Sequence, residues 1–391
     1  MDLTYTPQEE QFRAELRGWL ARVLPGLPAK PDPLDWPGRR TYDTAWQRML
    51  YDAGYADLQR EATPTQHLIF LEETERAGAP YVGANFVGLL HAGPTIAAEG
   101  SPEQRERWLP PILRGDEVWC QGFSEPDAGS DLASLRTKAV RDGDAYVVSG
   151  AKIWTSHAEV ADWCELLVRT TPVTPETPKH RGITWLAMPM DAPGVTVRPL
   201  RTLAGSTEFA EMFLDEVRIP VGNRVGAEND GWRVTMVTLS FERGTAFVGE
   251  VVACRRTLAA VAREAHANGC WDDPAIRRQL GRLHAEFAVL WRLTQWNVSE
   301  ARGAPPGRSP WGSTGGVPGA GGSVFKLRYS HARQELYDAA AEVLGAAGAL
   351  DLDHEWTLDR LSSLSYTIAA GTSQIQRNIV AERILGLPKG R

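Results

Sequence analysis

The middle of the chain reads Cys120-Gln-Gly-Phe-Ser-Glu-Pro-Asp-Ala-Gly-Ser-Asp131, and farther on Lys152-Ile-Trp-Thr-Ser156. The first stretch contains the Ser124 hydroxyl, and the second carries the flat ring of Trp154 two residues before the Ser156 hydroxyl. Two adjoining strands that end in hydroxyl and ring groups could form the floor of a site for a flat heteroaromatic cofactor. The alternative interpretation is an ordinary antiparallel sheet with polar turns.

The segment between these stretches predicts a β-hairpin. Lys138 to Gly150 carries runs of alternating apolar residues on either side of an Asp142-Gly143 turn, a pattern typical of paired antiparallel strands. Pro126 and Gly129 predict a rigid turn and a permissive backbone position just before this hairpin.

Composition indicates a folded protein with more than one domain. A chain of 391 residues with 43% hydrophobic and 23% charged residues can bury a large core. Its net charge of −7 offers no basic surface for nucleic acid, and no apolar run is long enough to suggest a membrane span. The polar start of the chain does not resemble a signal peptide. No two cysteines have the close spacing of metal ligands, so we expect no metal site and a reducing, cytoplasmic setting. The cysteines are Cys120, Cys164, Cys254 and Cys270.

The order of patterns predicts an α+β fold with a helical domain over 1–117, a mostly antiparallel β domain over 118–228 and a helical domain over 229–391. The first domain contains amphipathic stretches at 8–23 and 66–77, and a Ser-Pro helix start at 101–102. Five short β-prone runs fill the second: 146–148, 163–168, 183–188, 195–197 and 210–214. The Gly/Pro/Ser-rich stretch 303–322 predicts an exposed loop in the third.

Three segments in this order resemble signatures of the acyl-CoA dehydrogenase family: 123–131, 152–156 and Ala370-Gly-Thr-Ser-Gln-Ile-Gln-Arg-Asn-Ile379. The resemblance covers nearly the whole chain. It implies a flavoenzyme of fatty acid or lipid metabolism, commonly tetrameric, that uses FAD to dehydrogenate an acyl-CoA thioester between its α and β carbons. Electron-transferring flavoprotein is the acceptor that the resemblance implies.

The resemblance also assigns site residues. Phe123 and Ser124 would meet the pyrimidine side of the flavin, Trp154 would pack on the ring, and Ser156 would lie near N5 and O4. The remaining FAD contacts and the substrate contacts follow the same motifs. FAD would be touched by Gly129, Ser130, Thr372 and Gln374, and the substrate by Ser130, Arg243, Ala370 and Gly371. For each hydroxyl, a turn or helix-cap role is the alternative.

The position of the catalytic base departs from one family pattern. Many members carry a Glu where this chain has Ala370, which cannot accept a proton. Leu239-Ser-Phe-Glu-Arg-Gly244 resembles members whose base lies on the first helix after the β domain, so Glu242 is the predicted base that takes the α-proton while hydride passes to flavin N5. A general base must lie within hydrogen-bond reach of that proton.

The helix face around Glu242 offers it no basic partner. The residues stacked with it are Thr235, Thr238, Leu239, Thr245, Ala246 and Gly249. A face built largely of such small groups would leave room for a ligand. A solvated surface glutamate is the alternative interpretation.

Two further departures concern the adenosine half of the FAD site. An Arg-x-x-Phe-Gly segment of homotetrameric members is absent from 262–271, and Glu342-Val-Leu-Gly-Ala-Ala-Gly348 stands where Gln-x-x-Gly-Gly-x-Gly is usual. Both changes resemble subunits of heterotetrameric dehydrogenases that act on sterol side-chain thioesters. We therefore expect either a homo-oligomer with altered FAD contacts or an α2β2 assembly.

Two other functions remain open at this point. One is a flavin monooxygenase or oxidase on the same fold, which would not need a carboxylate at the base position. The other is a non-catalytic subunit of a hetero-oligomeric dehydrogenase, which Ala370 makes conceivable.

Overall fold

The structure is a computed structural model that describes residues 4–58, 62–245, 248–300 and 321–389, without the side chains of 240–245, 297, 299 and 300. Its residues form two compact units. The first comprises 1–26, 61–79 and 243–391, and the second comprises 27–60 and 80–242. No helix in the described ranges is long and apolar enough to cross a membrane.

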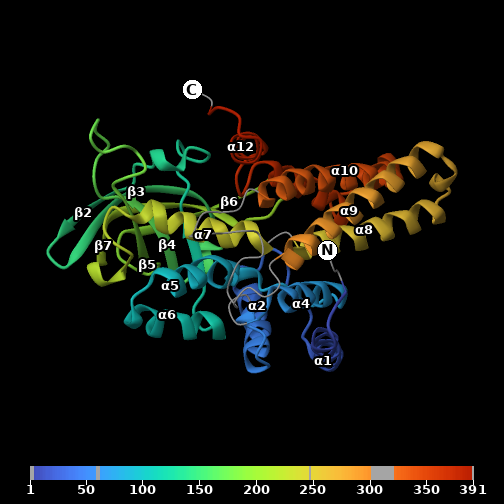
Figure 1. The fold of residues 1–391 in the computed structure, drawn as a ribbon, viewed down its shortest axis with the longest axis horizontal. Coiled ribbons are helices and arrows are strands. Elements are labelled where there is room, and N and C mark those ends of the chain that lie inside the picture. Colours follow the sequence, from blue (N-terminus) through green and yellow to red (C-terminus); the bar gives the residue numbers. More distant parts are fainter. Residues whose placement is uncertain (1–3, 59–61, 246–247, 301–320, 390–391) are drawn as a thin grey trace. The chain divides into compact units, whose positions relative to one another are not determined.

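The first unit is built on three long helices: α8 (Val248–Ala267), α9 (Pro274–Glu300) and α10 (Gly321–Ala349). They run side by side (Figure 1), and their apolar faces meet in one core that includes Leu258, Phe287 and Leu336. Shorter elements follow: α11 (Glu355–Ser363), η8 (Leu364–Thr367), α12 (Ser373–Ile379) and η9 (Val380–Ile384).

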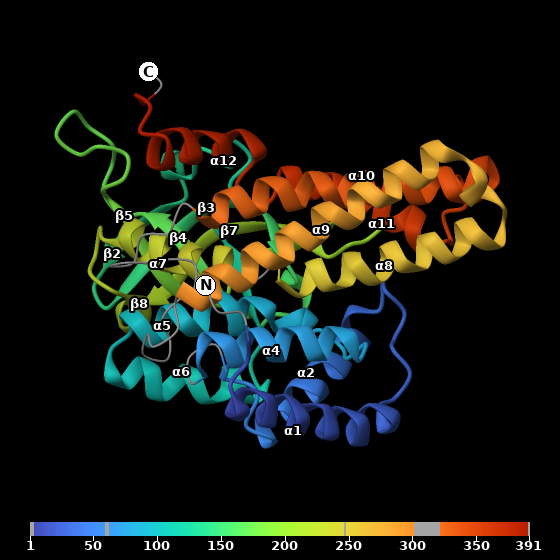
Figure 2. The same cartoon turned by 45° about the vertical axis from the view of Figure 1, so that its right-hand side comes forward.

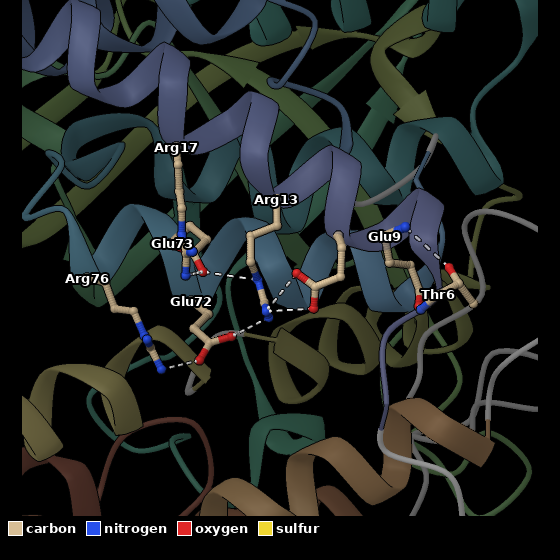
Figure 3. A network of polar contacts seen from close by, with 8 residues as sticks. Thr6, Glu9, Arg13, Arg17, Glu72, Glu73 and Arg76 are labelled. Carbon is tan, nitrogen blue, oxygen red and sulfur yellow. Dashed lines mark hydrogen bonds and ion pairs between the residues drawn. The ribbon is translucent and has the colours of Figure 1, made fainter.

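Two early helices complete this unit, α1 (Pro7–Val23) and α4 (Pro64–Arg76). Leu68 of α4 lies in the same core as α8 to α10. Charged groups tie α1 to α4 (Figure 3), because Arg13 contacts Glu72 at 3.3 Å and Glu73 at 3.2 Å while Arg17 contacts Glu73 at 2.6 Å. Both glutamates are buried, so these arginines neutralise carboxylates that would be unfavourable alone.

The second unit is a sheet with helices against it. In the described part of the chain eight strands form the sheet, in the order β6-β7-β3-β2-β4-β5-β8 with β1 beside β4. The strands are β1 (Trp119–Gly122), β2 (Lys138–Asp142), β3 (Ala145–Ser156), β4 (Trp163–Arg169), β5 (Ile183–Pro189), β6 (Val195–Leu200), β7 (Phe209–Pro220) and β8 (Arg224–Val225). Pairing is antiparallel except where β4 meets β1 and β2.

Alternate residues of the buried strands enter two different cores. On β5, Trp185 and Ala187 join a core with α5 (Gly93–Glu99) and α6 (Pro102–Arg114), which lie side by side against the sheet in Figures 1 and 2. Leu186 and Met188 point to a second core, made by side chains of β1 to β5 and β7. This two-residue period explains why the strands are apolar on both faces.

The remaining elements are α2 (Trp36–Asp52), α7 (Gly231–Thr245) and short turns of helix: η1 (Leu24–Gly26), η2 (Gly83–Asn85), η3 (Gly88–Ala92), η4 (Leu132–Ser134), η5 (Ala158–Val160), η6 (Val221–Asn223) and η7 (Cys270–Asp272). α2 begins after the proline-rich stretch 25–33, with Asp35 as its N-cap. The sequence patterns did not predict α2.

The predicted fold class is confirmed: a helical N-terminal domain, a middle β-sheet domain and a C-terminal helical domain. The hairpin is confirmed as well, but its turn lies one residue later than predicted. Asp142 pairs with Ala145, so the loop is Gly143-Asp144, with Gly143 at φ +61°. Glycine adopts that angle without steric cost. The predicted loop 303–322 lies outside the described residues except for its last two, which begin α10.

Candidate active site

The two signature segments of the second unit meet in space. After β1 the chain turns at Pro126, where the backbone groups of Glu125 and Ala128 bond to each other at 3.0 and 3.2 Å, which confirms the predicted turn. The N–H of Ile153 on β3 donates to the Ser124 carbonyl at 3.0 Å. The turn therefore lies directly beside β3.

A buried ion pair fixes the turn in place. Lys152 Nζ is 2.9 Å from Glu125 Oε1 and donates to the Phe123 carbonyl at 3.0 Å. The Glu125 carboxylate also accepts from the N–H groups of Arg136 and Thr137 at 2.6 and 2.8 Å. Burial alone would raise the pKa of Glu125, but Lys152 and these donors outweigh burial and lower it. Burial lowers the pKa of Lys152, and Glu125 opposes this.

Trp154 stands at an irregular point of β3. The pairing of β3 with β7 shifts between Lys152 and Thr155, and Trp154 adopts φ +63°. A bulky residue in this region is strained, and such bulges often redirect a side chain next to a functional site. The ring is 57% exposed and meets Phe209 edge-on at 5.9 Å. More than half of this residue's surface is thus open to a ligand.

The predicted hydroxyls next to this ring are available. Ser124 and Ser156 are both half-buried, and across the residues that the structure describes neither hydroxyl has a hydrogen-bond partner. The Phe123 ring is buried in the core and its carbonyl is used by Lys152, which leaves its backbone N–H to meet a ligand. Phe123 and Ser124 therefore lie in the turn beside β3, the strand that carries Trp154 and Ser156.

The part of the site predicted at Gly129 and Ser130 is open. Gly129 and Ser130 are exposed, and a Cβ at Gly129 would meet nothing within 4 Å. Gly129 also lacks a positive φ, so the backbone does not require a glycine there. Asp131 follows, held by Lys179 at 2.7 Å and by the Ser134 hydroxyl at 2.6 Å, and these bonds lower its pKa.

The first unit holds the third signature segment. Ala370 and Gly371 are consecutive left-handed residues, with φ +51° and +83°. Thr372 is the N-cap of α12, because its hydroxyl accepts from the Ile375 N–H at 3.2 Å. Thr372 therefore has the helix-cap role that was the alternative to contact with FAD. Gln374 is exposed on the first turn of the helix.

The predicted base lies on α7, but its side chain and that of Arg243 lie outside the described residues. Part of the helix face around Glu242 differs from the expectation of open space. Thr235 and Thr238 are fully buried, and the Thr238 hydroxyl bonds to that of Thr95 at 2.8 Å. This part of the face can pack against protein because both threonine hydroxyls have hydrogen-bond partners within the protein. Within the described ranges, no group of three or more His, Cys, Asp or Glu residues is placed to hold a metal ion.

Comparison with known proteins explains why these segments recur together. Models of the acyl-CoA dehydrogenase N-terminal, middle and C-terminal domains match residues 6–116, 120–217 and 229–385. The chain belongs to the acyl-CoA dehydrogenase family. It is 38% identical to the acyl-CoA dehydrogenase IpdE1 of Mycobacterium tuberculosis, over 97% of this chain and 98% of that protein. It is 35% identical to FadE26 of the same organism, over 100% and 99%.

Solved structures agree with this membership of the acyl-CoA dehydrogenase family. The ChsE4-ChsE5 complex from Mycobacterium tuberculosis matches with a TM-score of 0.81 and 33% identity, over 100% of both chains. A structure described as the Tcur3481-Tcur3483 steroid ACAD matches with a TM-score of 0.80 and 29% identity, again over 100% of both chains.

The two departures from the family's FAD pattern are neighbours in this acyl-CoA dehydrogenase. Asn268, in the segment that lacks the Arg-x-x-Phe-Gly motif, donates from Nδ2 to the Val343 carbonyl at 2.8 Å. Val343 follows the exposed Glu342, and Gly345 interrupts α10 with φ +71°. The changes thus alter one local surface of the first unit, not two separate places.

Sequence reasoning missed the residues that support this site. Lys152 and Glu125 lie within the motifs, which assign them no role. A lysine flanked by apolar residues in a predicted strand was the sequence signal for a buried charge at Lys152. His157 was also missed. It follows Ser156 with φ +58° and is buried between Trp36 and Phe86, at ring distances of 4.9 and 5.6 Å.

His157 makes stability depend on pH. Burial, with a smaller contribution from Arg39, lowers its pKa to about 3. His67, buried in the first unit, has its pKa lowered to about 4 by burial. The unfolded chain therefore binds more protons than the folded chain below pH 6.5, and stability falls as the pH drops through that window. Between pH 7 and pH 5 each histidine should lower the free energy of unfolding by about 2 kcal/mol.

We expect His157→Asn to remove its share of this pH dependence, because asparagine tolerates a positive φ and does not titrate. Urea unfolding at pH 7 and pH 5 measures the effect. The variant should lose about 2 kcal/mol less than the parent over this interval, and His67→Asn provides the matched comparison in the other unit. An identical pH dependence in parent and His157→Asn would show that His157 is not buried as a neutral group.

Proposed function

We propose that the chain binds FAD and dehydrogenates the α,β bond of an acyl-CoA thioester. The observation that carries the proposal is the convergence of Ser124, Trp154 and Ser156 beside an irregular strand, with both hydroxyls unpaired among the described residues. This donor set fits the polar edge and flat face of an isoalloxazine ring. When bound, FAD supplies the electron-accepting chemistry.

Each residue would have a separate role. Glu242 would take the α-proton as general base. The side chain of Ala370 cannot do so, but its backbone N–H could donate to the thioester oxygen and stabilise negative charge as it develops there. Ser130 and the open backbone at Gly129 would meet the pantetheine arm, and Arg243 and Gly371 would contact the substrate. Phe123, Thr372 and Gln374 would complete the FAD contacts.

We further propose that the chain works with an unlike partner subunit, in an α2β2 assembly, with electron-transferring flavoprotein as acceptor. Support comes from the altered surface where Asn268 meets Val343 and from the similarity to a chain of the ChsE4-ChsE5 complex. Exposed Glu342 beside that surface would be unfavourable near a pyrophosphate. An unlike subunit would then supply what this chain lacks for the adenosine half.

Anaerobic bleaching of the flavin by short, branched, long and steroid-derived acyl-CoAs tests the activity. We expect at least one class to bleach it, and failure of all four with a stoichiometrically loaded protein would contradict the proposal. Protein expressed alone that keeps stoichiometric FAD and full activity would refute the obligatory partner. Rapid oxygen consumption by the reduced protein would instead favour an oxidase.

A further inference from the structure

Lys326 lies in the interior of the first unit although lysine is a residue that is almost always exposed. It belongs to α10 and is only 1% exposed. Its ammonium group donates to the carbonyl of Gly371 at 2.7 Å. Burying the amino group of a lysine costs free energy unless the group keeps a hydrogen-bond acceptor. The hydrogen bond to Gly371 is therefore costly to break, and it holds the main chain of Gly371 in place.

The segment that Lys326 contacts has an unfavourable backbone. Ala370 and Gly371 both have positive φ, and for alanine this conformation persists only where surrounding contacts enforce it. A second buried side chain shares the task, because Gln376 Nε2 donates to the carbonyls of Ala370 and Gly371 at 3.0 and 3.2 Å. Both carbonyls are therefore turned towards Lys326 and Gln376.

The orientation of these two carbonyls also fixes the direction of the N–H groups in the same peptide units. The described peptide bonds are trans, so the N–H groups of Gly371 and Thr372 point away from the carbonyls that precede them. Within the described parts of the chain, neither N–H has an acceptor. The loop thus presents backbone donors on the side opposite Lys326.

We propose that Lys326 is a positioning residue, which holds the Ala370–Thr372 backbone so that its N–H groups are oriented for the thioester oxygen and the cofactor. This inference rests on the proposed function for the identity of the ligand, but not for the loop geometry. Lys326 would act through the Gly371 carbonyl and would not itself touch substrate. Its contribution is to preorganise donors before the ligand arrives.

The test compares Lys326→Met with Leu336→Ala. Both positions lie on α10, and Leu336 is fully buried in the helical core, so the second variant weakens the same helix without removing a contact to the loop. Amide hydrogen exchange of the purified full chain, followed by mass spectrometry, is the first measurement. We expect Lys326→Met to accelerate exchange of the 368–376 segment by about tenfold or more relative to Leu336→Ala.

Ligand binding is the second measurement. Dithionite-reduced enzyme cannot oxidise its substrate, so its affinities for octanoyl-CoA and for S-octyl-CoA, which lacks the carbonyl oxygen, can be compared directly. The parent and Leu336→Ala should prefer the thioester by up to about tenfold, and Lys326→Met should lose that preference.

Each outcome has a distinct meaning. Equal exchange of the segment in both variants, or a thioester preference that survives in Lys326→Met, would overturn the role of Lys326. If the parent binds neither CoA compound and none of the four acyl-CoA classes bleaches the flavin, the proposed function fails, and the exchange measurement still decides whether Lys326 positions the loop.

Discussion

Replacing Glu242 with glutamine is expected to reduce turnover of an acyl-CoA by about 10²- to 10⁴-fold, the usual contribution of a general base. Glutamine keeps the shape of the side chain but cannot accept the α-proton. The flavin should remain bound, because the FAD contacts proposed above come from other residues. Exchange of the α-proton of an acyl-CoA in deuterated water, followed by NMR, isolates the proton transfer from later steps.

Glu355→Gln is the matched control, since Glu355 is exposed in the first turn of α11. It should leave the exchange rate unchanged. If Glu242→Gln exchanges the α-proton as fast as the parent, another group is the base. Neither Ala370 nor any residue stacked on the helix face of Glu242 offers a carboxylate that could replace it.

Lys152→Met is expected to destabilise the protein by about 3–5 kcal/mol, the usual effect of removing one member of a buried ion pair. The ammonium is fully buried, and its loss would leave the carboxylate of Glu125 without its cation. The turn at 123–128 should then loosen, so flavin content should fall as well. Urea unfolding and the visible spectrum of the purified protein measure the two effects.

Two further variants make this result specific. Arg218→Met removes an ion pair of similar length, 2.7 Å to Asp142, in which both side chains are more than half exposed. It should leave the free energy of unfolding nearly unchanged, because water screens such a pair. Adding Glu125→Gln to Lys152→Met should recover part of the loss, because no charge stays buried. A loss below about 1 kcal/mol in Lys152→Met would contradict a dominant role for the pair.

The sequence predicted the fold class because its periodic patterns are local. The strand that includes Trp185 and the helix that includes Leu16 each show their buried faces in a few residues. The turn of the hairpin was missed by one residue, since Asp142-Gly143 and Gly143-Asp144 satisfy the same turn chemistry and only strand pairing distinguishes them.

The site was only partly predictable for a different reason. Motifs identified Ser124, Trp154 and Ser156, which would touch the ligand. The groups that hold the signature segments in place depend on contacts between residues far apart in the sequence, such as Lys152 with Glu125 and Lys326 with Gly371. No spacing rule connects such pairs, so burial of a charged side chain becomes visible only in three dimensions.

The discontinuity of the first unit has a consequence for how the protein is made. Its segments are 1–26, 61–79 and 243–391, so the second unit is inserted within it in two pieces, 27–60 and 80–242. During translation, α1 and α4 leave the ribosome long before the helices that share the core of Leu68 exist. The inserted unit can mature first, because domains generally fold as units during synthesis. The helix α4 must therefore wait for the last helices of the chain before Leu68 gains its permanent neighbours.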